Sequence, residues 1–262
     1  MMMGSMDLRE RVALITGGGR RLGKGITEAL AQAGCRVIIH YGRSRQEAEA
    51  TAEELRGRGT EAVCLSADLA EVAQIEEMFA AVGERFGRLD ILVNSAASFR
   101  KQALTEIDAE DWDRAMAVNL RAPFVCLRAA VPLMRAAARL EEVPAVVVNV
   151  GDLSGVFAWP GYAHHGASKA GLLHLTTVAA RELAPQIRVN SVIPGPILPP
   201  PGTDAADECW RGLVSGLPLA RPGLPAEVGA AVVFLAASDF ITGEAIRVDG
   251  GEHLLGAGHR RL

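Results

Sequence analysis

The segment from residue 164 to residue 169 reads HHGASK and holds the strongest candidates for chemistry in this chain. His165 and Lys169 are four residues apart, so on a helix their side chains lie on one face and point into the same site. An imidazole has an ordinary pKa of about 6.5 and serves as a general acid or base near neutral pH. The pair is therefore a candidate for proton transfer, with an imidazole at His165 and a cationic neighbour at Lys169.

A glycine-rich turn, TGGGRRLG, occupies residues 16–23 and joins an apolar run to a helical pattern. Glycines let the backbone turn tightly and let amide groups approach a pyrophosphate at the start of a helix. A plain turn between a strand and a helix can have similar letters, but the position after the first strand favours a dinucleotide site.

The segment HYGRSR, at residues 40–45, follows the second apolar run. NAD-specific sites place an acidic residue near this point to bind the ribose 2′-hydroxyl. Here there is no acid, and two arginines suit a 2′-phosphate through charge-assisted hydrogen bonds. The segment predicts NADP(H) rather than NAD(H), with a solvated basic loop as the alternative.

The elements that would hold these residues alternate along the chain. Short runs that are apolar on both faces are separated by helical patterns, which is typical of a parallel sheet covered by helices on both sides. Strand–helix–strand repetition with right-handed crossovers gives a doubly wound α/β fold. The expected strands are residues 12–16, 36–41, 62–67, 91–96, 145–150, 188–193 and 245–250.

No linker divides the sequence, so we expect a single domain over residues 8–262, preceded by an N-terminal tail or expression remnant at 1–7. The one irregular region is 194–223, rich in proline and glycine. A connection of that length in a regular fold indicates a substrate lid. We expect Trp210 and Leu213 either to line the pocket from this lid or only to pack the lid onto the body.

Composition excludes several classes of function. The formal net charge of -4 gives no basic footprint for nucleic acid. The longest apolar runs in the sequence stop short of the roughly 18–20 residues that a membrane-spanning helix needs, and the first residues do not resemble a signal peptide. The four cysteines form no CxxC pair, which predicts reduced thiols in a cytoplasmic protein with no metal site.

Several motifs in the same order resemble the short-chain dehydrogenase/reductase family over residues 8–252. These are the glycine-rich turn, Asp68 in SADL, Asn94 in NSA, Asn119 in AVNL, Lys169, and P194-G195. The resemblance implies a Rossmann-type seven-stranded parallel sheet, NADP(H) as cofactor, a small-molecule substrate and a homo-oligomer, dimer or tetramer. It also implies that Asp68 contacts the adenine and that Asn94 supports the central strand and the adenosine. In the family, the residue at Asn119 anchors a proton-relay water, and the residue at Lys169 holds the nicotinamide ribose.

Within that family, the chain looks most like the pteridine reductase branch. Arg21 replaces the middle glycine of the usual turn, and HYGRS is similar to that branch's phosphate-binding loop. Phe99 falls where these reductases place an aromatic side chain against the pterin. Asp152, thirteen residues before His165, stands where most of the family has a serine and this branch has an aspartate. Each position also has a plainer interpretation: Phe99 as a core aromatic, Arg21 as a surface residue, and Asp152 as a cap of the following loop.

His165 departs from the family, which has a tyrosine four residues before the lysine. Tyr162 is not a simple replacement, since it lies seven residues before Lys169, about two turns or roughly 10 Å along a helix. General acid–base help is worth about 10²- to 10⁴-fold, whereas hydride transfer is the cofactor's own chemistry. The loss of the phenol is therefore expected to slow a reductase without abolishing it.

Three functions are consistent with these residues. The first is NADPH-dependent reduction of a dihydropterin, folate or similar heterocycle. The second is reduction of a carbonyl or 3-oxoacyl substrate, which Asp152 argues against, because an ionised carboxylate cannot donate the hydrogen bond that a serine gives. The third is an NADP(H)-binding sensor or scaffold that has lost its activity, for which His165 is the main support.

The residues assigned to these roles fall into three sets. The catalytic set is Asp152, His165, Lys169 and Asn119, and the substrate set is Arg21, Phe99, Asp152, His165 and Trp210. Asp249, Gly250 and Gly251 resemble the family's C-terminal turn near subunit contacts, and the final HRRL is placed across such a contact. The dinucleotide set is Thr16, Gly17, Arg20, Arg21, Leu22, Gly23, His40, Tyr41, Arg43, Ser44, Ala67, Asp68, Leu69, Asn94, Ser95, Ala96, Lys169, Pro194, Gly195 and Ile197.

Overall fold

Seven strands form one sheet in this computed structural model, which describes residues 6–200 and 202–256. Every residue of β1 and of β5 is buried, because helices cover both faces of the sheet and leave no polar side. The spatial order is β3-β2-β1-β4-β5-β6-β7, and all neighbours are parallel. The strands are β1 (Val12–Ile15), β2 (Arg36–Tyr41), β3 (Ala62–Ser66), β4 (Ile91–Asn94), β5 (Ala145–Val150), β6 (Ile187–Pro194) and β7 (Ala245–Val248).

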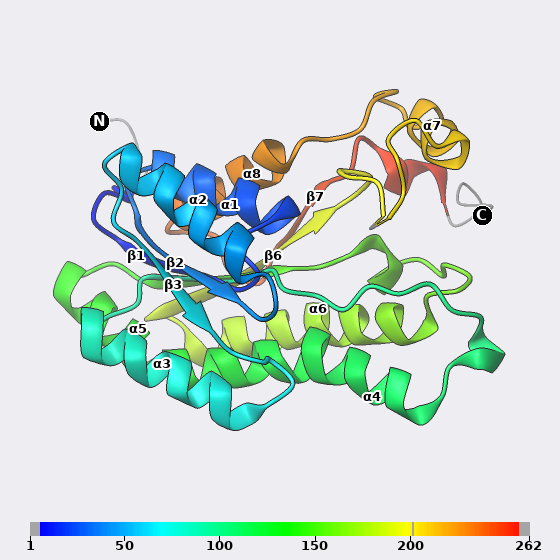
Figure 1. Cartoon of the computed structure of the whole chain (residues 1–262). Helices are drawn as coiled ribbons and strands as arrows, with labels where there is room; N and C mark the ends of the chain where they lie inside the picture. The colour runs from blue at the N-terminus through cyan, green and yellow to red at the C-terminus, as the bar shows by residue number, and fades with distance from the viewer. Residues whose placement is uncertain (1–5, 201, 257–262) are drawn as a thin grey trace.

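The helices form two layers, one on each face of the sheet (Figure 1). One apolar cluster joins the sheet to α1, α2 and α8, and a second joins its other face to α3, α5 and α6. The α-helices are α1 (Arg21–Gln32), α2 (Arg45–Gly57), α3 (Val72–Phe86), α4 (Ala109–Met116), α5 (Ala122–Glu141), α6 (Ala163–Leu183), α7 (Glu208–Ser215) and α8 (Pro225–Ala237). Short 3₁₀ turns are η1 (Leu104–Glu106), η3 (Leu153–Gly155) and η4 (Glu252–Leu255), and η2 (Ala117–Arg121) is a π-helical turn.

The sheet changes its direction of growth at β1, which has β2 on one side and β4 on the other. Ligands of such sheets bind in the crevice at the carboxyl ends of the strands beside this point. The hydroxyl of Thr16 closes the base of the crevice, since it accepts hydrogen bonds from the backbone N–H groups of Ser95 (2.9 Å) and Ala96 (3.1 Å).

The predicted doubly wound, single-domain α/β fold is confirmed. Four strands end earlier than the sequence indicates, because the last one or two residues of 12–16, 62–67, 91–96 and 245–250 turn out of the sheet at the edge where the crevice lies. Of the expected tail at 1–7, residues 1–5 lie outside the described residues. In the part that is described, Met6 N donates to the carbonyl of Ala237 at 2.8 Å.

One helical stretch is longer and more apolar than the sequence patterns suggested. α4, η2 and α5 run continuously from Ala109 to Glu141, and an 18-residue window of this stretch has a mean hydropathy of 1.3. By length and composition alone it could cross a membrane. In the fold, however, α5 packs on α3 and on the sheet, and its residues Cys126, Ala130 and Met134 are fully buried. The stretch is a core helix of this domain.

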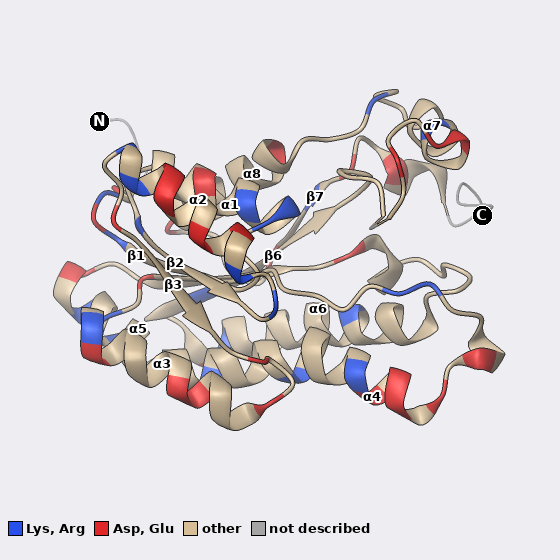
Figure 2. Ribbon diagram, in the orientation of Figure 1, with Lys and Arg blue, Asp and Glu red and all other residues tan. Residues whose placement is uncertain are grey.

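Charged side chains of both signs lie on the outer helices, and the strands carry few of them (Figure 2). α1, α2, α3 and α4 each show mixed colours rather than a face of one sign. Among the described residues, this distribution agrees with the small net charge and shows no basic stripe for a polyanion in this view.

The irregular segment 194–223, of which residue 201 is not described, leaves the sheet at the end of β6 and contains α7. Its two ends are joined, because Gly223 N donates to the carbonyl of Pro196 at 2.9 Å. Leu219 N donates to the carbonyl of Gly250 at 3.2 Å and fixes the segment to the turn after β7. α7 is thereby held at the carboxyl edge of the sheet (Figure 1).

Candidate functional site

A cavity of about 1150 Å³ occupies the crevice at the carboxyl ends of the strands. Every residue that the sequence assigned to the dinucleotide, the substrate or catalysis lines this cavity, except Thr16, Asn94 and Asn119. Those three lie directly behind its wall and are 2%, 3% and 0% exposed. Leu213 and Trp210 also line the cavity, so the segment 194–223 contributes to its wall.

The glycine-rich turn is held in place by His40. Gly17 has a positive φ of 65°, which favours glycine, and its N–H donates to Nδ1 of His40 at 3.1 Å. The other ring nitrogen, Nε2, therefore carries the hydrogen that is donated to the carbonyl of Ala67 at 3.0 Å. Burial keeps the pKa of His40 below its ordinary value, in agreement with a neutral ring that ties β1 to β3.

Gly19 allows α2 to approach this turn. A Cβ atom at Gly19 would lie 2.6 Å from Cα of Ala48, which is a backbone atom that cannot move aside cheaply. Arg21, the first residue of α1, has a φ of 50°, and its guanidinium donates to the carbonyl of Pro199. Arg21 therefore connects the glycine-rich turn to the segment 194–223, in addition to lining the cavity.

The end of the cavity beside β2 suits a phosphate. Arg43 is exposed, Ser44 is half-buried, and both line the cavity directly after β2. Residues 40–45 contain no carboxylate. A guanidinium and a hydroxyl at this position provide donors for a 2′-phosphate. The donor set therefore fits NADP(H).

His165 lies near the start of α6 and is 1% exposed. Its Nδ1 is 3.0 Å from the backbone carbonyl of Ser98 and 3.2 Å from Nδ2 of Asn119. Its Nε2 is buried, faces Oδ2 of Asp152 at 3.6 Å, and has no hydrogen-bond partner in the described chain. The ring is thus anchored through one nitrogen and presents the other beside the cavity.

Asp152 follows β5 and begins the 3₁₀ turn η3, where its Oδ1 accepts a hydrogen bond from the N–H of Ser154 at 2.7 Å. The plainer interpretation of Asp152 as a cap is therefore correct, and it holds together with a place in the cavity wall. Burial raises the pKa of Asp152, but the neighbouring His165 and the Ser154 N–H outweigh burial and hold the pKa below its ordinary value. The carboxylate is the form that this site stabilises.

Lys169 is one turn after His165 and is 3% exposed. Its Nζ donates to the carbonyl of Val150 at 2.7 Å. Burial lowers the pKa of Lys169 to about 8, and the negative charge of Asp152 offsets only part of that effect. The ammonium therefore lies at the floor of the cavity with one backbone partner.

Asn119 lies in the π-helical turn η2 and makes direct contacts with site residues. Its Oδ1 accepts from the N–H of Ser98 at 2.7 Å, and its Nδ2 donates to the carbonyl of Ser98 at 2.9 Å. Nδ2 also lies 3.1 Å from Oγ of Ser168. π-helical turns are frequent at functional sites, and this one brings the amide against the loop after β4.

Aromatic side chains form one wall of the cavity. The ring of Phe99 stacks on Tyr162, with centroids 4.9 Å apart, and meets His165 edge-on at 4.8 Å. Trp159 lies edge-on to Tyr162 at 6.1 Å. Phe99 is therefore no core aromatic, since it is 36% exposed and lines the cavity.

Sequence reasoning missed four of these residues. Tyr162 was expected about two turns from Lys169 along a helix, but it precedes α6 and joins the cavity wall together with Trp159. The sequence signal that could have identified Tyr162 and Trp159 as cavity residues was the presence of two aromatic side chains in the loop before the HHGASK segment. Ser98 and Ser168 contact Asn119, and no sequence pattern marked them.

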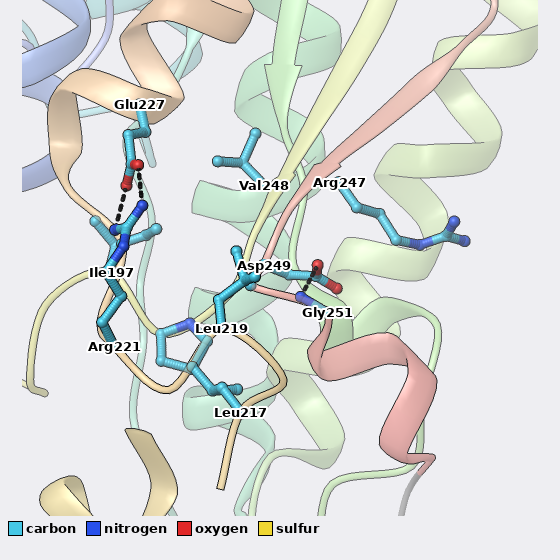
Figure 3. A pocket seen from close by; sticks show the side chains of 12 residues that line it. Ile197, Leu217, Leu219, Arg221, Glu227, Arg247, Val248, Asp249 and Gly251 are labelled. Carbon is cyan, nitrogen blue, oxygen red and sulfur yellow. Dashed lines mark hydrogen bonds and ion pairs between the residues drawn. The ribbon is translucent and has the colours of Figure 1, made fainter. Parts of the chain in front are cut away.

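A second cavity, of about 300 Å³, lies between the segment 194–223 and the turn after β7. In Figure 3 the side chains of Arg221 and Glu227 face each other as an ion pair, and Arg247 points away from them. Asp249 accepts hydrogen bonds from the N–H groups of Gly251 and His253. These contacts fix the C-terminal turn, while the final HRRL lies outside the described residues.

Metal ligands do not gather anywhere in residues 6–200 and 202–256, where no three His, Cys, Asp or Glu side chains form a group. The four cysteines are free, and burial raises the pKa of Cys126 to about 12. These thiols carry no part of the chemistry described above.

A parallel doubly wound sheet with a glycine-rich turn at its crossover, and a lysine and an acid–base group at the crevice, defines a dinucleotide-dependent oxidoreductase of Rossmann type. The chain belongs to the short-chain dehydrogenase/reductase family. A family model described as Enoyl-(Acyl carrier protein) reductase matches residues 19–253.

Among curated proteins, the 3-oxoacyl-[acyl-carrier-protein] reductase FabG of Staphylococcus aureus is 35% identical over 245 residues, which are 92% of this chain and 98% of that protein. Among solved structures, the RhlG/NADP active-site complex of Pseudomonas aeruginosa has a TM-score of 0.87 at 35% identity and covers 96% of this chain and 100% of that one. FolM Alternative dihydrofolate reductase 1 from Brucella canis, complexed with NADP, has a TM-score of 0.84 at 34% identity. The match covers 95% of this chain and 96% of that one.

Proposed function

We propose that this protein is an NADPH-dependent reductase of a carbonyl group in a 3-oxoacyl-type substrate. The observation that carries the proposal is the convergence of His165, Lys169 and Asp152 on one cavity whose other end has the donors for a 2′-phosphate. The FabG relative supports the substrate class, and the RhlG and FolM complexes with NADP support the cofactor.

The residues of the glycine-rich turn and the end of β2 bind the cofactor in this proposal. Backbone amides of residues 17–23 hold the pyrophosphate at the start of α1, and Arg43 with Ser44 holds the 2′-phosphate. Lys169 binds the nicotinamide ribose through its ammonium. When bound, NADPH supplies the hydride.

His165 supplies the proton. A doubly protonated ring donates Nδ1–H to the carbonyl of Ser98 and directs Nε2–H toward Asp152 and the cavity. The carbonyl carbon gains a hydride and its oxygen gains the proton from Nε2, which leaves an alcohol and a neutral imidazole. His165 thereby also gives the oxygen a hydrogen-bond donor that Asp152 cannot provide.

A second candidate is reduction of a dihydropterin or folate-like ring. Phe99 offers a ring face at the cavity wall, and the Asp152 carboxylate can accept hydrogen bonds from an amino group and a ring nitrogen. The FolM structure supports this candidate. The sequence patterns put it first, but the relatives favour the carbonyl substrate, so it takes second place.

The experiment that tests both candidates follows NADPH oxidation at its nicotinamide absorbance. Acetoacetyl thioester, a β-ketoester and dihydrobiopterin are compared at equal concentrations, with NADH as the cofactor control. Turnover of the thioester or ketoester at least about tenfold above that of the pterin supports the first proposal. The reverse ratio replaces it with the second, and saturable NADPH binding without turnover of any substrate indicates a sensor or scaffold.

The family resemblance extends the proposal to assembly and location. We infer a homo-tetramer, or a dimer, in the cytoplasm. Phe124, Phe234 and Phe240 are exposed aromatic side chains that a subunit interface could bury. Light scattering after gel filtration tests the assembly, and a monomer at micromolar concentration rejects it.

A further inference from the structure

The side-chain amide nitrogen of Asn119 has three possible hydrogen-bond partners but only two hydrogens. Its Nδ2 lies within reach of the Ser98 carbonyl (2.9 Å), Oγ of Ser168 (3.1 Å) and Nδ1 of His165 (3.2 Å). An amide nitrogen carries two hydrogens, so it can donate fully to only two of the three. Which two of these atoms receive the amide hydrogens determines whether Nδ1 of His165 accepts a hydrogen bond or carries a hydrogen of its own.

Oγ of Ser168 is one of the two acceptors of the Asn119 amide hydrogens. Its hydroxyl donates to the backbone carbonyl of His165 at 2.6 Å, so its hydrogen is used and its lone pairs remain available. It therefore accepts one hydrogen from Asn119. The Ser98 carbonyl, which can only accept, takes the other, and Ser98 N–H donates back to Oδ1 of Asn119 at 2.7 Å. Asn119 has no hydrogen left for His165.

The Ser98 carbonyl then determines the protonation of Nδ1. It lies 3.0 Å from that nitrogen, and two acceptors at this distance would repel each other. Nδ1 must carry a hydrogen and donate it to the second lone pair of the same oxygen. The neutral ring is consequently the Nδ1–H tautomer, and Nε2 holds the lone pair.

Nε2 is left as the only nitrogen of this ring that gains and loses a proton. It is buried, it lacks a hydrogen-bond partner in the described chain, and it belongs to a residue that lines the cavity opposite Asp152. The rings of Phe99 and His165 meet at 89°, with their centroids 4.8 Å apart. A buried polar atom without a partner is expected to be satisfied by a ligand in the cavity.

We propose that Asn119 and the Ser98 backbone carbonyl are positioning groups that fix the tautomer of His165, so that Nε2 delivers the proton. The identity of the group that accepts the proton rests on the proposed reductase function. The tautomer of His165 does not depend on it. This assignment differs from the water-anchoring role that the family resemblance implies for Asn119, since Asn119 acts here on the imidazole through the Ser98 carbonyl.

The direct test uses the unmodified protein. Nitrogen NMR of histidine-labelled protein, with the His165 signals identified by their loss in His165→Gln, reports which ring nitrogen carries hydrogen when the ring is neutral. We expect a protonated Nδ1 and a lone pair on Nε2. The opposite tautomer, or an equal mixture, overturns the proposal.

Variants separate positioning from general damage to the site. Asn119→Ala frees the Ser98 loop, so we expect loss of the tautomer preference, a fall in kcat of about tenfold to hundredfold, and an NADPH Kd changed by less than about threefold. Ser168→Ala removes the acceptor of one amide hydrogen, which is then free to reach Nδ1 of His165 at 3.2 Å, so we expect the preference for the Nδ1–H tautomer to weaken. An Asn119→Ala protein that keeps the tautomer while losing kcat overturns the positioning role.

The NMR result and the activity assay can fail independently. If no substrate is reduced but the tautomer is as expected, the reductase proposal fails and the assignment of the ring nitrogens stands. If reduction occurs with the opposite tautomer, the function stands and this inference is rejected.

Discussion

Nε2 of His165 faces Oδ2 of Asp152 at 3.6 Å, so the proposed acid–base group of this cavity has a carboxylate beside it, at the position where the family resemblance implies a serine hydroxyl in most members. The distance is longer than a hydrogen bond, yet both side chains line the same wall. Nε2 of His165 therefore faces a carboxylate that does not hold it in a short hydrogen bond.

Replacement of His165 tests whether the imidazole supplies the proton. His165→Gln keeps a polar side chain but cannot transfer a proton, so kcat should fall by about 10²- to 10⁴-fold. NADPH binding should change little, since the cofactor contacts are proposed for other residues. Steady-state rates and fluorescence titration of NADPH check this, and an unchanged kcat would show that another group donates.

Neutralisation of Asp152 tests the electrostatic part of the site. Asp152→Asn keeps an oxygen for the Ser154 N–H but removes the negative charge 3.6 Å from Nε2 of His165. The pKa of Asp152 is held below its ordinary value, so the carboxylate is charged at neutral pH, and its loss should lower kcat/KM by about tenfold at pH 7. Asp113→Asn, at an exposed position outside the cavity, is the control. An unchanged kcat/KM would separate Asp152 from the proton transfer.

The preference for NADPH should depend on Arg43. Arg43→Ala removes a charge-assisted contact with a 2′-phosphate, which corresponds to a rise of about tenfold to hundredfold in the NADPH Kd. The NADH Kd should stay within about twofold. Arg45→Ala, the first residue of α2 and not part of the cavity wall, is the matched control. Equal losses for both cofactors would contradict a role in phosphate binding.

Lys169 should make the stability of the cofactor-free protein depend on alkaline pH. Its pKa of about 8 in the fold lies below the usual 10.5, so between these values the unfolded chain binds the proton more strongly than the folded chain does. The free energy of unfolding should therefore rise from pH 8 to pH 10.5, by at most about 3 kcal/mol. Lys169→Met lacks this contribution, and urea unfolding of both proteins across that range measures the difference. A constant difference between the two curves would contradict the lowered pKa.

The order of the elements followed from sequence because each level of the pattern agrees with the next. Runs such as AVVVNV are apolar on both faces, which is typical of a covered parallel strand, and TGGGRRLG after the first such run suits a tight turn into a helix. Strand ends were less certain. Ala67 and Ala96 are small apolar residues that suit a strand or a turn equally well, and contacts made elsewhere in the fold decide between them.

The sequence by itself determined the doubly wound fold, the dinucleotide turn and the polar residue types that line the cavity, because these depend on local periodicity and on residue chemistry. Only the tertiary structure decided that Tyr162 joins Phe99, that Ser98 and Asn119 hold one nitrogen of His165, and that the other nitrogen faces Asp152. Those contacts join residues that are tens of positions apart in the chain. The distances between these side chains depend on how the carboxyl ends of β4 and β5 pack against η2 and α6. The spacing of residues in the sequence does not specify that packing.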